Sequence, residues 1–170
     1  MVTLHADYTT GRVSQAPISL FDRNLDQTNI DRCSTNWALL YQQINQANSV
    51  LANVPKITKI ADDVKNKILA EAHFLRSMAY FNLVRGWGAV PIKIAESADV
   101  SAIAGVREPV TKVYDLILAD ALAAEKDLPE TVADQTGRAS NYAAKRLLAH
   151  ISLPLESFPE AATKPKEVIP

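Results

Sequence analysis

The chain has 170 residues, of which 48% are hydrophobic and 22% are charged, a composition that suffices for one ordinary hydrophobic core. Its 18 basic and 19 acidic residues give a formal net charge of -1, so no excess positive charge would attract the phosphates of a nucleic acid. We therefore expect no nucleic-acid partner.

A low glycine content and many alanine and leucine residues favour helices over a sheet-rich fold. Residues 1–35 have no sustained hydrophobic period and include Gly11, Pro17 and several Asp and Asn residues. We expect them to form an irregular lead-in to a helical-repeat domain at residues 36–153. They lack the basic start and apolar run of a secretory signal, and no stretch of the chain approaches the roughly 20 apolar residues that span a bilayer.

A first helix is predicted at residues 36–53, because apolar side chains recur there at three- and four-residue steps. Ser34, Thr35 or Asn36 could cap its N-terminus. Pro55 should end the helix, since the residue before a proline is pushed away from the α-helical region.

The longest helix is predicted at residues 60–86, where the same spacing is sustained. It should end at the sequence Gly86-Trp87-Gly88, because glycine adopts the left-handed backbone of a helix C-terminus without strain. Pro91 follows a few residues later, as is typical after a helix end.

We expect this long helix to pack against the first one, with small alanines allowing a close approach. The predicted contact residues are Trp37, Ile44, Leu75 and Ala79. If Leu75 is buried there, its replacement by Ala should cost about 2–5 kcal/mol.

Two further helices follow an extended segment and loop at residues 90–107. Pro109 suits a first helical position, and apolar spacing continues from it to Leu128. Ser140 can cap a fourth helix whose apolar face runs to Ile151. The predicted fold is all-α, with four antiparallel helices in two pairs and long loops between helices.

The last segment, residues 154–170, has the composition of the truncated start of a further repeat. Pro159 suits its first helical position, but Pro165 lies inside the would-be helix. Pro154 should end the fourth helix at or near Leu153. We expect this last segment to be mobile and to contribute little to stability.

Four blocks of sequence resemble one family. Residues 36–48 read NWALLYQQINQAN and are similar to the opening helix of the SusD/RagB family. Residues 71–91 read EAHFLRSMAYFNLVRGWGAVP and resemble the most recognisable stretch of that family, EA-x-FLRA-x2-YF-x-LV-x2-WG-x-VP. Two shorter blocks follow in the same order, at residues 113–129 and 137–144.

The resemblance implies a surface-exposed lipoprotein of the cell outer membrane that binds oligosaccharide or polysaccharide in nutrient uptake. It also implies a TonB-dependent transporter as the partner and a non-catalytic role. The scaffold would be helical repeats, with antiparallel helix pairs of tetratricopeptide-like (α-α superhelix) type. Glu71 and Arg76 would then be hydrogen-bonding or ion-pair positions between helices. The structural motif positions carried by the resemblance are Glu71, Arg76, Tyr80, Trp87, Gly88 and Pro91.

Catalytic and metal-binding motifs are missing from the sequence. His5, His73 and His150 lie on three different segments, and Cys33 is the only cysteine, so neither an intramolecular disulfide nor a zinc site built on paired cysteines can form. Nucleophile-elbow and glycine-rich phosphate-loop sequences are also absent. We therefore expect no catalytic residues, no cofactor and no metal, and stoichiometric zinc or calcium in the purified protein would contradict this.

Sugar binding requires flat aromatic faces together with polar groups that hydrogen-bond hydroxyls. Trp37 and Tyr41 open the first predicted helix beside Asn36, so these three residues are the candidate ligand contacts. Both rings also lie on the apolar stripe of that helix, which favours a place in the core. Trp87, between two glycines, is expected to pack against Pro91.

Two alternatives to glycan binding stay open. A generic helical-repeat module would bind a protein or peptide in its concave groove, and titration against a panel of oligosaccharides would separate it from a glycan-binding protein. A small hydrolase would need two carboxylates about 5 to 9 Å apart, and would show glycosidase turnover that one carboxylate substitution abolishes.

Overall fold

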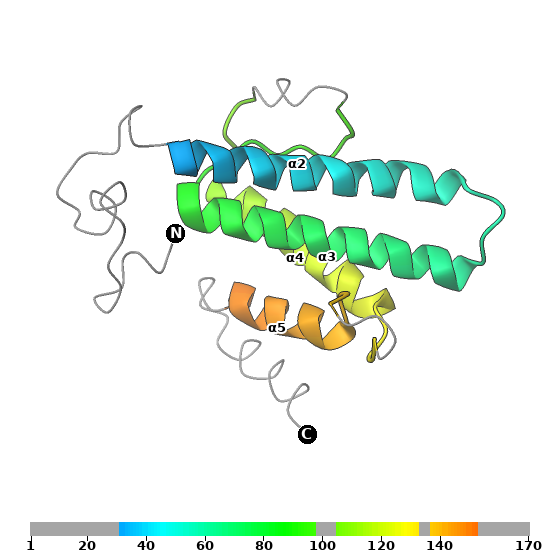
Figure 1. The fold of residues 1–170 in the computed structure, drawn as a ribbon. Helices are drawn as coiled ribbons and strands as arrows, with labels where there is room; N and C mark the ends of the chain where they lie inside the picture. The colour runs from blue at the N-terminus through cyan, green and yellow to red at the C-terminus, as the bar shows by residue number, and fades with distance from the viewer. Residues whose placement is uncertain (1–30, 98–104, 133–136, 153–170) are drawn as a thin grey trace. The chain divides into compact units, whose positions relative to one another are not determined.

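The computed structural model describes residues 31–97, 105–132 and 137–152, and all the regular elements in these ranges are helices. The elements are α2 (Asp31–Asn53), η3 (Val54–Lys56, a 3-10 helix), α3 (Asp62–Trp87), α4 (Val110–Asp127) and α5 (Asn141–Ser152) (Figure 1). The predicted all-α class is confirmed. No helix in the described ranges has both the length and the apolar character that a membrane span requires.

The chain divides into two compact units, residues 1–37 and 38–170. Within the second unit, α3 packs along α4, and α4 packs along α5. The part of α2 in this unit reaches α3 through Gln43, whose side-chain amide donates to the Leu75 carbonyl (2.8 Å). The largest fully buried apolar side chains of the described residues are Ile44, Tyr80, Leu83, Val90, Val113, Ile117 and Ile151.

Two helix ends follow the chemistry of the residues found there. α3 ends at Trp87, where Gly88 has a φ of +69° and donates its N–H to the Val84 carbonyl (2.9 Å). Ser140 caps α5, because its hydroxyl accepts a hydrogen bond from the Ala143 N–H (3.3 Å). Both ends agree with the predictions from sequence.

Two predicted helix starts are wrong by a few residues. α2 begins at Asp31, so residues 34–36 lie inside the helix and do not cap it. The preference of Ser, Thr and Asn for cap positions is small, and it is outweighed where a long helix continues through them. α4 begins at Val110, and Pro109 is its N-cap residue with an extended ψ of 146°.

The buried face of α3 differs from the predicted one at Leu75. Ile44 and Ala79 are buried as expected, whereas 43% of Leu75 is exposed. Arg76, the next residue, is buried instead, and a hydrophobic periodicity cannot assign a core position to an arginine. The cost of 2–5 kcal/mol expected for a buried Leu75 therefore does not apply.

The connection between α3 and α4 is not helical. Val90 and Glu108 form an isolated antiparallel bridge, in which the Glu108 N–H donates to the Val90 carbonyl (3.1 Å). Residues 1–30 and 153–170 lie outside the described ranges. With them lie most of the expected irregular lead-in, the expected end of the fourth helix, and the C-terminal segment predicted to be mobile.

Candidate functional site

A buried polar cluster joins α2, α3 and α4. The Arg76 guanidinium donates from Nε to Asp120 Oδ2 (2.7 Å) and from Nη2 to Asp120 Oδ1 (2.8 Å), which makes a bidentate pair. Its third donor, Nη1, reaches Asn48 Oδ1 (2.7 Å). His73 Nδ1 lies 2.7 Å from Asp120 Oδ1 at the edge of the cluster. One arginine of α3 therefore connects three helices.

Burial and ion pairing act in opposite directions on Asp120, whose side chain is 4% exposed. Burial raises the pKa of this carboxyl group, while hydrogen bonds from Arg76 and His73 lower it, and the resulting pKa is below the ordinary value of 3.8. The group is therefore an ionised carboxylate held by its neighbours. Among the described residues, no three His, Cys, Asp or Glu side chains gather where they could hold a metal ion.

Two tyrosines hold the non-helical residues 91–97 in place. Tyr80 Oη donates to the Lys93 carbonyl (2.9 Å) and accepts from the Lys93 N–H (2.6 Å). Tyr41 Oη donates to the Pro91 carbonyl (2.6 Å). Burial, the largest cause, raises the pKa of Tyr80 to about 12 and also raises the pKa of Tyr41. Both hydroxyls therefore keep their protons and donate at neutral pH.

Two asparagines of α2 hold the same segment. The Asn45 amide donates to the Ser97 carbonyl (2.8 Å), and its oxygen accepts from the Ser97 N–H (2.7 Å). Asn48 Nδ2 donates to the carbonyls of Lys93 (3.0 Å) and Ala95 (3.2 Å). The asparagines are three residues apart and so share one face of α2. Their partners Lys93, Ala95 and Ser97 are alternate residues of the segment. In an extended chain, the main-chain groups of alternate residues point to the same side.

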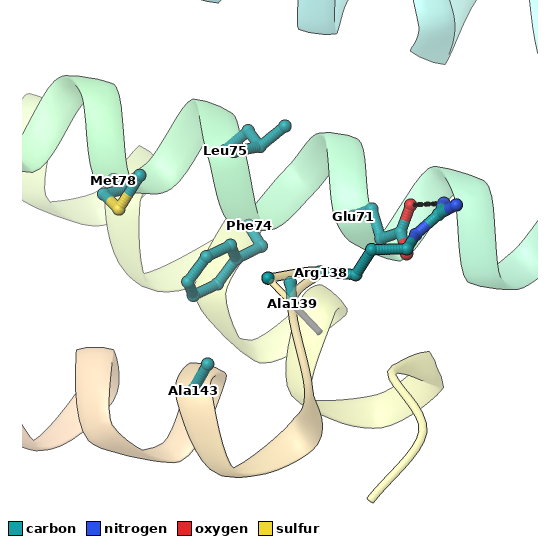
Figure 2. A pocket seen from close by; sticks show the side chains of 8 residues that line it. Glu71, Phe74, Leu75, Met78, Arg138, Ala139 and Ala143 are labelled. Atoms are coloured by element: carbon teal, nitrogen blue, oxygen red, sulfur yellow. Dashed lines mark hydrogen bonds and ion pairs between the residues drawn. The ribbon is translucent and has the colours of Figure 1, made fainter. Parts of the chain in front are cut away.

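A cavity of about 430 Å³ lies between α3, α5 and the turn before α5 (Figure 2). Figure 2 shows Phe74 pointing from α3 toward α5, where Ala143 faces it. Glu71 and Arg138 lie at one end of the cavity and form a two-contact ion pair, in which Arg138 Nε donates to Glu71 Oε1 (2.8 Å) and Nη2 contacts Oε2. This pair ties the start of the α5 region to α3.

A second cavity of about 490 Å³ continues from the first toward the C-terminal end of α3. It shares Phe74, Met78 and Ala143 with the first cavity. Three basic residues line it, namely Arg85, Arg146 and His150. The second cavity therefore combines an apolar floor with basic side chains.

The three candidate ligand residues differ in their surroundings. Asn36 is exposed and Trp37 is partly buried. Tyr41 is only 2% exposed, and its hydroxyl is bound to the main chain of Pro91. Tyr41 therefore belongs to the core and presents no ring face to a ligand in this structure.

Sequence reasoning did not identify Asn45, Asn48 and Asp120 as parts of a polar network. Asn48 and Asp120 lie in two of the blocks that resemble the SusD/RagB family, and this resemblance is the feature of the sequence that could have marked them as structurally important. Their partner Arg76 is 28 and 44 residues away in sequence. No local pattern encodes contacts over such separations.

Comparisons with known proteins agree over most of the chain. A SusD-like family, described as starch-binding and associating with the outer membrane, matches residues 4–153. SusD-like protein P2 of Formosa agariphila is 32% identical over 141 residues, which cover 80% of this chain and 27% of that protein. A SusD-like protein of Bacteroides ovatus is 30% identical over 139 residues, which cover 79% of this chain and 24% of that protein.

Solved structures give the same fold. A structure described as a laminarin-binding SusD-like protein superposes with a TM-score of 0.79 at 28% identity, over 90% of this chain and 32% of that one. A SusD superfamily protein from Parabacteroides distasonis superposes with a TM-score of 0.71 at 32% identity, over 87% of this chain and 32% of that one. The chain spans about a quarter of the length of the curated relatives it matches.

Proposed function

The chain belongs to the SusD-like family of starch-binding proteins that associate with the outer membrane, and from this premise we propose that it is the helical scaffold of a non-catalytic oligosaccharide-binding protein. The observation that carries the proposal is the family match over residues 4–153. The description of one structural neighbour as laminarin-binding supports a glucose polymer as the class of ligand.

The chemistry of the described polar residues supports a scaffold. Asp120 of α4 and Glu71 of α3 each contact an arginine through both carboxylate oxygens. A carboxylate bound in this way does not serve as the general acid or nucleophile of a glycosidase, which needs a carboxyl group facing the substrate. These residues instead fix the positions of helices.

Asn36 and Trp37 are the residues that we propose for ligand contact within this chain. A tryptophan ring offers the largest flat apolar face among side chains, and a neighbouring amide can hydrogen-bond sugar hydroxyls. Asn36 is exposed and Trp37 is partly exposed, whereas Tyr41 is withdrawn into the core. The proposed contact therefore involves two of the three candidates.

Isothermal titration with malto-oligosaccharides and laminari-oligosaccharides tests the proposal. We expect saturable binding by the protein and a loss of at least about tenfold in affinity for Trp37→Ala, since truncating an aromatic hot-spot residue costs about 2 kcal/mol or more and tenfold corresponds to about 1.4 kcal/mol. Leu39→Ala is the control, because Leu39 is an exposed apolar residue on the same helix. The absence of binding to both series, or unchanged affinity in Trp37→Ala, would contradict ligand contact at Asn36 and Trp37 of this chain.

A TonB-dependent outer-membrane transporter is the partner that we propose, with the protein anchored at the cell surface as a lipoprotein. The resemblance described above and the outer-membrane association of the family support this location. Affinity purification of the tagged protein from outer membranes of its source organism should recover a TonB-dependent transporter in stoichiometric amount. Recovery of the protein in the soluble fraction, without a transporter, would contradict the proposal.

A further inference from the structure

The two cavities between α3 and α5 lie next to each other, and we call the surface that they form together the α3–α5 groove. They share Phe74, Met78 and Ala143, and together they extend along α3 from Glu71 to Arg85. These two residues are about four helical turns apart, which corresponds to roughly 20 Å at 1.5 Å per residue. The groove is therefore long enough to accept about 14 residues of another helix.

The central part of the groove is lined by apolar side chains. Phe74 and Met78 of α3 lie at its centre, where the two cavities meet. Leu75 lines one cavity while 43% of it is exposed, and Tyr142 lines the other while 38% of it is exposed. Large apolar side chains that are open to solvent and surround a depression favour an interaction surface.

Charge is distributed unevenly along the groove. At the Glu71 end, the carboxylate is paired with Arg138. At the other end lie Arg85, Arg146 and His150. Within the described ranges, none of these three basic residues has a carboxylate partner, and the Arg85 guanidinium instead lies 5.2 Å from the centre of the Phe81 ring. This end of the groove therefore attracts acidic groups.

We propose that the α3–α5 groove binds an amphipathic helix of a partner protein, with an apolar face bordered by acidic residues. A groove between two helices fits the mode in which a helix inserts side chains at three- and four-residue spacing. Its apolar side chains lie over Phe74 and Met78, and its carboxylates lie beside Arg85 and Arg146. Neither Asn36 nor Trp37 lines either cavity, so the proposal does not depend on glycan binding.

Two designed peptides of 18 residues test the proposal. Both carry leucine at the same helical positions, and one has glutamate flanking the leucine face where the other has lysine. We expect fluorescence anisotropy to give at least tenfold tighter binding of the glutamate peptide at low ionic strength. The difference should shrink as salt rises, because exposed charges are screened.

Three variants locate the binding surface. Arg146→Glu should weaken the glutamate peptide at least fivefold and strengthen the lysine peptide, because it reverses the charge at the basic end. Leu75→Gln should weaken both peptides, because it removes an apolar contact. Lys126→Glu makes the same charge change on α4, at an exposed position that lines neither cavity, and should alter neither affinity. All three positions are exposed, so the folded state is expected to be retained.

Four results would overturn the proposal. One is equal affinity for the two peptides, and another is no response to Arg146→Glu. A third is peptide binding that appears only after residues 154–170 are deleted, which would assign the groove to the protein's own C-terminal segment. The fourth is a dimer in sedimentation velocity that Arg146→Glu converts to monomer, which would assign the groove to a second copy of the chain.

Discussion

Arg76 is the residue on which the polar interior depends most. It is buried, and it donates to both oxygens of Asp120 and to Asn48. The sequence could mark Arg76 as a candidate for an ion pair between helices, because it lies in a block resembling a known family. It could not identify Asp120 as the partner, because the pair is formed by two helices whose packing is a property of the whole fold.

Replacing Asp120 with Asn should destabilise the protein by about 3–5 kcal/mol, because the charge of Arg76 then stays buried without a counterion. Urea unfolding followed by circular dichroism measures the loss. Asp115→Asn is the control, since Asp115 is an exposed carboxylate on the same helix. The expected role of the Asp120 pair is wrong if both variants have the unfolding midpoint of the parent protein.

The same pair predicts an acid dependence of stability. The pKa of Asp120 is lower in the folded protein than its ordinary value, so its ionisation stabilises the fold above the unfolded pKa of about 3.9. As pH falls below that value toward the folded pKa, this contribution is lost. The difference in urea midpoint between parent and Asp120→Asn should therefore narrow below about pH 4, and a constant difference from pH 7 to pH 3 would contradict the assignment.

At the scale of elements, the four helices were predictable because each has sustained three- and four-residue spacing of apolar side chains. Their ends were predictable where a residue has a strong backbone preference, as at Gly88 and Ser140. The start of α2 was not predictable, since residues 34–36 are compatible with both a cap and a helix interior. The exposure of Leu75 was not predictable either, because the buried position beside it is occupied by a polar residue, Arg76.

Replacing the two glycines around Trp87 with alanine should change the stability of the protein in opposite directions. Gly88→Ala should destabilise the protein by about 1–3 kcal/mol, because Gly88 has a φ of +69° that an L side chain rarely adopts. Gly86→Ala should stabilise it by about 0.5–1 kcal/mol, because Gly86 is inside α3 with no atom near an added Cβ. Thermal unfolding of both variants tests this, and equal shifts would show that the Gly88 backbone is not as described.

Tyr80 should control the local stability of the segment at residues 91–97. Tyr80→Phe removes the hydroxyl that bonds both main-chain groups of Lys93, and leaving such groups without a partner costs about 1–3 kcal/mol. Amide hydrogen exchange should become faster at Lys93. The exchange rate of the Leu83 amide, in the buried part of α3, should change only as much as the global unfolding equilibrium changes. Tyr142→Phe, on an exposed tyrosine, is the control, and unchanged exchange at Lys93 would argue against the contact.

At the scale of the whole molecule, α3 is the central element of the described chain. It contacts α4 and α5 directly, exchanges hydrogen bonds with α2, and contributes Tyr80 to the segment that follows it. The all-α class followed from composition and periodicity. Composition and periodicity did not predict which helices pack together. The apolar stripe of a helix indicates which of its faces is buried, but not which other helix covers that face.

Leu83 and Leu75 provide a direct measure of how α3 is oriented in the molecule. Leu83 is fully buried, so Leu83→Ala should cost about 2–5 kcal/mol. Leu75 is 43% exposed, so Leu75→Ala should cost much less, about 1 kcal/mol or below. Urea midpoints of the two variants at equal m-values give the comparison, and a larger loss for Leu75 would mean that α3 is rotated about its axis.

The contacts to residues 91–97 are made to main-chain atoms, and this has a consequence for mutational tolerance. Asn45, Asn48 and Tyr80 bond the N–H and carbonyl groups of alternate residues, which are the same in every amino acid except proline. Ile94, between two bonded residues, is 65% exposed. The outward side chains of this segment can therefore be substituted without loss of the hydrogen bonds from α2 and α3. The same helices can hold segments whose exposed side chains differ.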